Sequence, residues 1–112
     1  MITEMSFKTP IFIRIVYSMT SQVEVRVKGV VNETTGMVMD LADLKLEIQF
    51  LLEQVDHKCL DKDVPYFVER PSTVENICIF FWEALVGRLP EGVKLNKIKV
   101  HETDKNYASY KG

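Results

Sequence analysis

The sequence predicts an α+β domain built on an antiparallel sheet, and three observations lead to this class. Apolar and charged side chains alternate over residues 23–28, which is the period of a strand with one buried face. From Leu41 onward the apolar residues recur at steps of three and four, the period of an amphipathic helix. The predicted elements follow the order strand, strand, helix, helix, strand, strand, so sheet and helices are segregated rather than alternating.

Two strands open the predicted fold. Residues 11–17 are rich in β-branched and aromatic side chains, which favours a first strand. The alternating segment 23–28 is the second, and we expect the two to form a hairpin that turns through Ser18 to Ser21. The turn formers of residues 32–36 then lead the chain away from the sheet.

Two helices follow. Asp40 is a natural N-cap for the first, whose apolar face runs from Leu41 to Val55. The segment 61–71 contains two prolines and is expected to be irregular. Residues 72–75 have the Ser-x-x-Glu spacing of a capping box, with Ser72 as the cap of a second helix that ends near Leu89.

The last strands carry a carboxylate in an unusual position. Ile98 and Val100 alternate with polar residues as a third strand, and residues 106–110 are a short fourth. Glu102 has the same parity as Ile98 and Val100, so it ends an apolar face, where a carboxylate needs a partner or a shifted pKa. From parity alone, Glu102 is either a solvated residue beyond the strand, a partner of a lysine, or a functional group.

Composition limits the classes of function. A chain of 112 residues is expected to form one domain, 1–112, with a small core that oligomerisation would supplement. The net charge of −2, mixed along the chain, argues against nucleic acid or an anionic membrane as a partner, and no apolar run approaches a membrane span. Two cysteines do not make a disulfide framework, so a reducing, cytoplasmic setting is expected.

Few residues carry chemistry. Asp56 and His57 are adjacent at the end of the first helix, where they are either a proton-relay pair or an incidental polar pair. Cys59 is interpreted as a loop thiol and Cys78 as a core residue. His101 points to the opposite face from Glu102, which favours a surface or interface position. Two further residues, Lys97 and Lys99, either are solvated or attract phosphate.

Three stretches together resemble a known family. The first, residues 34–45, contains the motif Gly-Met-Val-Met-Asp, and the second, residues 55–67, contains Asp-His-Lys. The third, residues 72–112, contains Ser-Thr-Val-Glu-Asn and Glu-Thr-Asp. Their order and spacing resemble the 6-pyruvoyl tetrahydropterin synthase family, and the animal-type enzyme more closely than the queuosine-pathway 6-carboxytetrahydropterin synthases. The similarity runs from about Val23 to the C-terminus, whereas residues 1–22 diverge.

The resemblance implies a tunnelling fold, in which an antiparallel four-stranded sheet in the order ββααββ carries two helices on one face. It also implies homo-oligomers, trimers or hexamers, with active sites between subunits. The implied activity is that of a lyase of tetrahydrobiopterin biosynthesis. It converts the pterin substrate 7,8-dihydroneopterin triphosphate to 6-pyruvoyl tetrahydropterin and triphosphate, with zinc as cofactor and a catalytic cysteine.

Family roles transfer only to matching residues. By resemblance, Asp56 and His57 match the catalytic proton relay, in which a carboxylate fixes the imidazole tautomer and raises its basicity. Glu102 matches the pterin anchor, because a carboxylate can accept two parallel hydrogen bonds from the ring N–H and the amino group. Thr73 matches a residue that lines the pterin pocket.

The zinc side has no such match. The three family histidine positions hold Ile11, Tyr17 and Met19, and the insert with the catalytic cysteine has no counterpart in these residues. No metal site is therefore assigned, because catalytic zinc takes three protein ligands and an open position. A substitute site is not favoured either, since the remaining histidines and Cys59 lack a standard ligand spacing.

Three hypotheses follow for function. The chain belongs to the synthase by descent but is inactive alone. Alternatively, it is a non-catalytic pterin-binding or assembly subunit of mixed oligomers. The third hypothesis is an α+β interaction domain without a pterin role.

Overall fold

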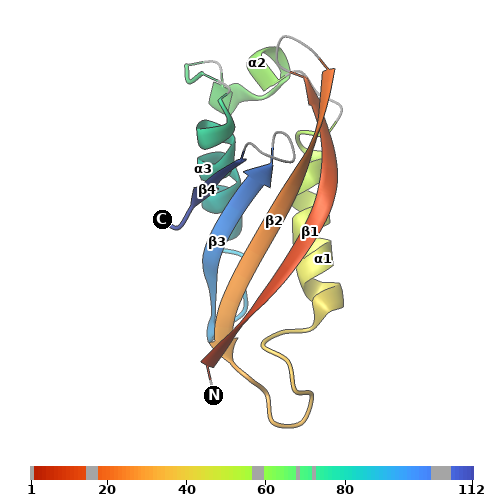
Figure 1. Cartoon of the computed structure of the whole chain (residues 1–112), viewed down its shortest axis with the longest axis vertical. Helices are drawn as coiled ribbons and strands as arrows, with labels where there is room; N and C mark the ends of the chain where they lie inside the picture. Colours follow the sequence, from red (N-terminus) through yellow and green to blue (C-terminus); the bar gives the residue numbers. More distant parts are fainter. Residues whose placement is uncertain (1, 15–17, 57–59, 68, 72, 102–106) are drawn as a thin grey trace.

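The computed structural model describes residues 2–14, 18–56, 60–67, 69–71, 73–101 and 107–112, with backbone only for 11–14, 18–21 and 61. It confirms the predicted class: one antiparallel four-stranded sheet with its two long helices on one face (Figure 1). The sheet order is β1-β2-β3-β4, so consecutive strands are also neighbours. The strands are Ile2–Arg14 (β1), Ser18–Val30 (β2), Val93–His101 (β3) and Tyr107–Tyr110 (β4).

The first hairpin is longer than predicted, and its turn lies elsewhere. β1 begins at Ile2. Ser18 and Ser21 belong to β2, where Ser18 pairs with Arg14 of β1 and Ser21 pairs with Ile11 of β1. The predicted turn through Ser18 to Ser21 is therefore wrong. Ladder hydrogen bonds to a long partner strand outweigh the weak intrinsic preference of serine for turns. The link between the strands, residues 15–17, lies outside the described residues.

The first helix, α1 (Leu41–Glu53), begins where the sequence predicts. The Asp40 side chain accepts a hydrogen bond of 2.8 Å from the Ala42 N–H, as an N-cap does. The helix buries Leu44, Ile48 and Leu51 against the sheet. Val55 is also buried, but in the turn after the helix rather than in the helix itself.

The segment predicted to be irregular contains two short helical pieces, α2 (Leu60–Asp63) and the 3₁₀ turn η1 (Pro65–Phe67). Leu60, Val64 and Phe67 are buried. Their contacts with the core stabilise the helical turns of this segment, which its two prolines do not predict.

The second long helix, α3 (Val74–Leu85), is capped one residue later than predicted. The Thr73 hydroxyl accepts the Asn76 N–H at 3.2 Å, while Ser72 lies outside the described residues. The helix also ends four residues before Leu89. Gly87, a poor helix former, follows its C-cap and accounts for the early end.

The core lies between the sheet and the helices. α1 contacts β1, and α3 contacts β3 and β4 (Figure 1). β2 presents every second side chain to the helices, and residues 98 and 100 of β3 do the same, as their parity predicted. The sheet residues that are at most 1% exposed are Val23, Val25, Val27, Ile98 and Val100.

No helix within the described ranges is long and apolar enough to cross a membrane. The longest are α1, with 13 residues, and α3, with 12.

Gly29 provides a test of the packing between β2 and the loop before β3. A Cβ at this position would lie 2.7 Å from the Gly92 carbonyl oxygen and 3.1 Å from Val38 Cγ1. We expect Gly29→Ala to lower the free energy of unfolding by about 1–3 kcal/mol, because a backbone atom has to move. Urea denaturation measures the change.

The matched control is Gly87→Ala, since a Cβ there meets no atom within 4 Å. It should change the free energy of unfolding by less than about 0.5 kcal/mol. Equal destabilisation by both substitutions would contradict the close approach at Gly29.

Candidate functional site

The predicted site residues that the structure describes lie at one end of the molecule. α1 ends there, α3 and β2 begin there, and β3 ends there at His101 (Figure 1). Asp56 follows α1 at this end, and Thr73 precedes α3. His57 and Glu102, the other two predicted site residues, lie outside the described residues, and so do Cys59 and Tyr17.

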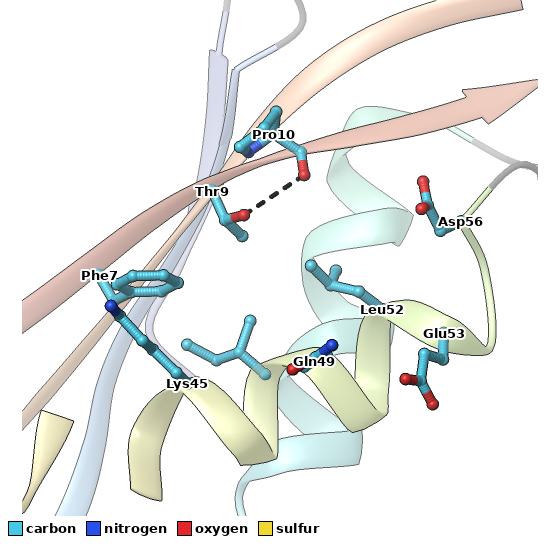
Figure 2. Close-up of a pocket in the computed structure, with 9 residues that line it drawn as sticks. Phe7, Thr9, Pro10, Lys45, Gln49, Leu52, Glu53 and Asp56 are labelled. Atoms are coloured by element: carbon cyan, nitrogen blue, oxygen red, sulfur yellow. Dashed lines mark hydrogen bonds between the residues drawn. The ribbon is translucent and has the colours of Figure 1, made fainter. Parts of the chain in front are cut away.

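Asp56 is held by the turn that ends α1. Its N–H donates to the Leu52 carbonyl oxygen at 2.7 Å, and the preceding Val55 N–H donates to the same oxygen at 3.0 Å. Because Val55 is 1% exposed, its burial fixes the position of the turn. The Asp56 side chain is half-buried and lies on the side of α1 that faces β1 (Figure 2).

A cleft of about 400 Å³ separates α1 from β1, and Asp56 lies at one end of it (Figure 2). The opposite end holds Phe7 and Lys45, whose Nζ is 5.4 Å from the centre of the Phe7 ring, within cation–π range. The cleft thus combines carboxylate, ammonium, amide and aromatic groups and is open to solvent. Its lining residues are Phe7, Thr9, Pro10, Lys45, Ile48, Gln49, Leu52, Glu53 and Asp56.

The sequence analysis missed the strand side of this cleft. Phe7 and Thr9 reach it because β1 begins at Ile2, whereas the predicted strand began at Ile11. The alternation of half-buried with exposed residues from Thr3 to Thr9 is the period-2 signal that identifies this part of β1.

Thr73 is an exposed helix cap. Its hydroxyl accepts the Asn76 N–H, and the Asn76 side-chain amide donates to the Pro71 carbonyl oxygen at 2.8 Å. These two bonds hold the start of α3 and leave the Thr73 hydroxyl at the molecular surface. A cap of this kind contributes about 1 kcal/mol to helix stability, so Thr73 has a structural role whatever it binds.

His101 and Lys99 lie on the face of the sheet away from the helices. The His101 ring is 5.5 Å from the Tyr107 ring, and Lys99 Nζ is 3.9 Å from the centre of the same tyrosine. The prediction that His101 faces away from the apolar side is confirmed, because its neighbour Val100 is buried against the helices.

Cys78 is a core residue, as predicted. It is 1% exposed, and its Sγ is 3.4 Å from the Ala108 carbonyl oxygen of β4. Burial raises the pKa of the Cys78 thiol from 9.0 to about 11. The thiol therefore stays protonated at neutral pH and is a poor nucleophile.

The zinc positions implied by the family resemblance do not fit the metal. The backbone places Ile11 and Met19 on adjacent strands, with Ile11 opposite Ser21 and Met19 opposite Ile13. Neither an isoleucine nor a methionine side chain supplies the nitrogen, thiolate or carboxylate ligand that zinc takes. Among the residues that the structure describes, no three histidine, cysteine or acidic side chains are grouped so as to hold a metal ion.

Comparison with known proteins gives a consistent result. Residues 15–112 match the family model described as 6-pyruvoyl tetrahydropterin synthase. The human 6-pyruvoyl tetrahydrobiopterin synthase is 49% identical over 92 residues, which cover 81% of this chain and 63% of the human protein. The Drosophila melanogaster protein of the same name is 42% identical over 91 residues, 80% of this chain and 54% of that protein. The chain thus spans about three-fifths of the length of the curated relatives it matches.

Solved structures agree with the sequence relatives. The 6-pyruvoyl tetrahydropterin synthase of Caenorhabditis elegans superposes with a TM-score of 0.84 and 31% identity, covering 100% of this chain and 95% of that one. A Wolinella succinogenes protein at 17% identity and a TM-score of 0.75 shares the fold.

The buried thiol predicts a pH dependence of stability. In the unfolded chain Cys78 loses its proton near its ordinary pKa of 9.0, whereas in the folded chain it keeps the proton up to about 11. The thiol therefore contributes stability that is fully present below pH 9 and is lost as the pH rises from 9 to 11. Urea denaturation between pH 8 and 11 should show a steeper fall in unfolding free energy for the wild type than for Cys78→Ala.

Cys59→Ser serves as the control, because it removes the other thiol and leaves Cys78 in place. In this variant the unfolding free energy should fall with pH as steeply as in the wild type. If Cys78→Ala retained the full slope above pH 9, another group would be responsible.

Proposed function

The chain belongs to the 6-pyruvoyl tetrahydropterin synthase family, and from this premise we propose that it binds the pterin substrate of that enzyme and is not a complete catalyst by itself. In this proposal the family reaction is the elimination of triphosphate from 7,8-dihydroneopterin triphosphate to give 6-pyruvoyl tetrahydropterin. The observation that carries the proposal is the match of residues 15–112, which contain Asp56, His57, Thr73 and Glu102, to the synthase family model. The 49% identity to the human synthase over 92 residues supports it.

Each of these residues has a proposed role. Asp56 orients His57, which takes and returns a proton on the substrate side chain, since histidine exchanges protons near neutral pH. The position of Asp56 supports this role, because the buried Val55 and the backbone bonds of Val55 and Asp56 to the Leu52 carbonyl oxygen hold its main chain at the end of α1. Glu102 accepts the paired N–H groups of the pterin ring, and Thr73 lines the pocket.

The family's zinc chemistry is not assigned to this chain. Ile11, Tyr17 and Met19 occupy the family histidine positions, so no step of the reaction is routed through a metal held by these residues. For this reason we expect the chain by itself to bind the pterin without converting it.

Assembly with other subunits is the second candidate function. The sheet is open, with β1 and β4 as its edge strands, and an exposed edge favours pairing with another subunit. We propose that the chain forms homo-oligomers, trimers or hexamers. In mixed oligomers it would act as a non-catalytic subunit that donates Asp56 and His57 to the zinc-binding half of a complete neighbour.

Turnover by the isolated chain tests the first proposal. Purified chain, mixed with 7,8-dihydroneopterin triphosphate and zinc, should give no product above the rate without protein. Product detection by chromatography measures this. Robust turnover would overturn the proposal that the chain is incomplete, and a full-length synthase assayed in parallel shows that the substrate is competent.

Complementation tests the mixed oligomer. A full-length synthase whose own Asp-His pair has been removed should regain activity when it is co-expressed with this chain, and native mass spectrometry should find both subunits together. The Asp56→Asn variant should enter the same oligomers without restoring activity. Oligomers that never mix would count against this function.

Pterin affinity tests the role of Glu102. Replacement by alanine leaves the donor pair of the pterin without its acceptor, so we expect binding to weaken by about 2–4 kcal/mol. Fluorescence titration with a stable pterin measures the change. Glu91→Ala is the matched control, because Glu91 is an exposed loop glutamate at the other end of β3. Unchanged affinity in Glu102→Ala would favour an interaction domain without a pterin role.

A further inference from the structure

The helix α1 carries a second apolar surface, on the side that faces away from the sheet. Leu44, Ile48 and Leu51 are buried on the inner side of the helix. Leu46 and Phe50 lie on the outer side, one turn apart, and they are 64% and 49% exposed. A single exposed apolar side chain is ordinary, but two large ones on adjacent turns of one helix form a continuous patch.

The ring of Phe50 is held in place although it is exposed. Arg88, which follows α3, places its guanidinium carbon 4.3 Å from the centre of this ring, within cation–π range. The guanidinium is itself fixed by α1, because its Nε donates to Glu47 Oε2 at 2.6 Å. One side chain from outside the helix thus supports the ring, and the rest of the ring surface faces solvent. An anchor that is already ordered loses less entropy on binding.

A carboxylate stands at each end of the patch. Asp43, Leu46, Phe50 and Glu53 succeed one another at steps of three, four and three, so they form a stripe along one side of the helix. Asp43 and Glu53 are exposed, and neither forms a salt bridge with any side chain that the structure describes. Glu53 lies on the rim of the α1–β1 cleft, and its carboxylate points away from β1 (Figure 2). The ten positions between the two carboxylates correspond to about 15 Å along the helix axis.

The charges of the stripe select among the surfaces that could cover it. An antiparallel pair of α1 helices that packs Leu46 against Phe50 also brings the flanking carboxylates of the two copies together, because the spacing of the stripe is the same from both ends. A parallel pair opposes each carboxylate to its own copy. Like charges opposed across an interface disfavour both arrangements. Anionic membranes bind helices with basic flanks, so they are disfavoured as well.

We propose that the stripe formed by Asp43, Leu46, Phe50 and Glu53 is a docking surface for a basic amphipathic helix of another protein. The apolar side of that helix covers Leu46 and Phe50. Two of its lysine or arginine residues, about three turns apart, pair with Asp43 and Glu53. Two exposed side chains supply a small apolar area, which suits a transient contact of micromolar affinity. Docking requires neither pterin binding nor turnover, so it succeeds or fails separately from the proposed function.

Two designed peptides test the surface. Both are amphipathic helices with the same leucine stripe, flanked in one peptide by two lysines three turns apart and in the other by two glutamates. Fluorescence anisotropy with the full chain at low salt should show saturable binding of the lysine peptide, roughly ten-fold tighter than that of the glutamate peptide.

The apolar anchor is tested in the same assay. Phe50→Ala should weaken binding of the lysine peptide by roughly ten-fold, because it removes the ordered aromatic anchor. Val30→Ala is the matched control and should bind like the wild type. Val30 is 64% exposed at the end of β2, and strand parity places it on the face of the sheet away from the helices, here called the open face.

Reversing the flanking charges separates specific docking from general adhesion. Asp43→Lys combined with Glu53→Lys should prefer the glutamate peptide, and a loss of folding cannot produce a reversed preference. Glu33→Lys combined with Glu91→Lys is the matched control, because it makes the same change of charge at two exposed loop residues. This control should still prefer the lysine peptide.

Several results would overturn the proposal. Non-saturable binding, equal affinity for the two peptides, unchanged affinity in Phe50→Ala, or a reversed preference in the loop control would each do so. Two further measurements identify a different occupant. A smaller oligomer of Phe50→Ala than of wild type in sedimentation velocity would assign the stripe to a second copy of this chain. Flotation of wild type but not Phe50→Ala with phosphatidylcholine vesicles would assign it to a membrane.

Discussion

The strict alternation of β2 is the constraint on which this structure depends. β2 pairs with both β1 and β3, and its three valines, Val23, Val25 and Val27, are at most 1% exposed. A shift of one residue would move all three valines to the open face and would place charged residues under the helices. The helices α1 and α3 pack against an apolar face of the sheet only because this register is kept.

The same alternation separates two surfaces with different chemistry. On the helix side, the end of α1 and the long β1 make a mixed cleft with Asp56 at one end and Lys45 at the other. On the open face, the register sets Arg26 opposite Lys97 and Lys28 opposite Lys94. One property of β2 therefore positions both the cleft that contains Asp56 and the charged rows on the face of the sheet away from the helices.

Much of the fold was predictable because its signals are local. The Asp40 cap, the apolar face of α1 and the parity of Ile98 and Val100 depend on residues near in sequence. The errors arose where contacts distant in the sequence decide the structure. Ser18 to Ser21 look like a turn until a partner strand that begins at Ile2 is present to pair with them. Residues 61–71 look irregular until Val64 and Phe67 are buried.

The sequence by itself determined the family and the order of the elements, because these follow from motifs and short periods. Only the tertiary structure decided which residues of separate strands meet. Phe7 faces Lys45 across the cleft, and Lys97 stands opposite Arg26, 71 positions earlier in the chain. The physical reason is register: each strand fixes its own two faces, but pairing alone sets which side chains share a row.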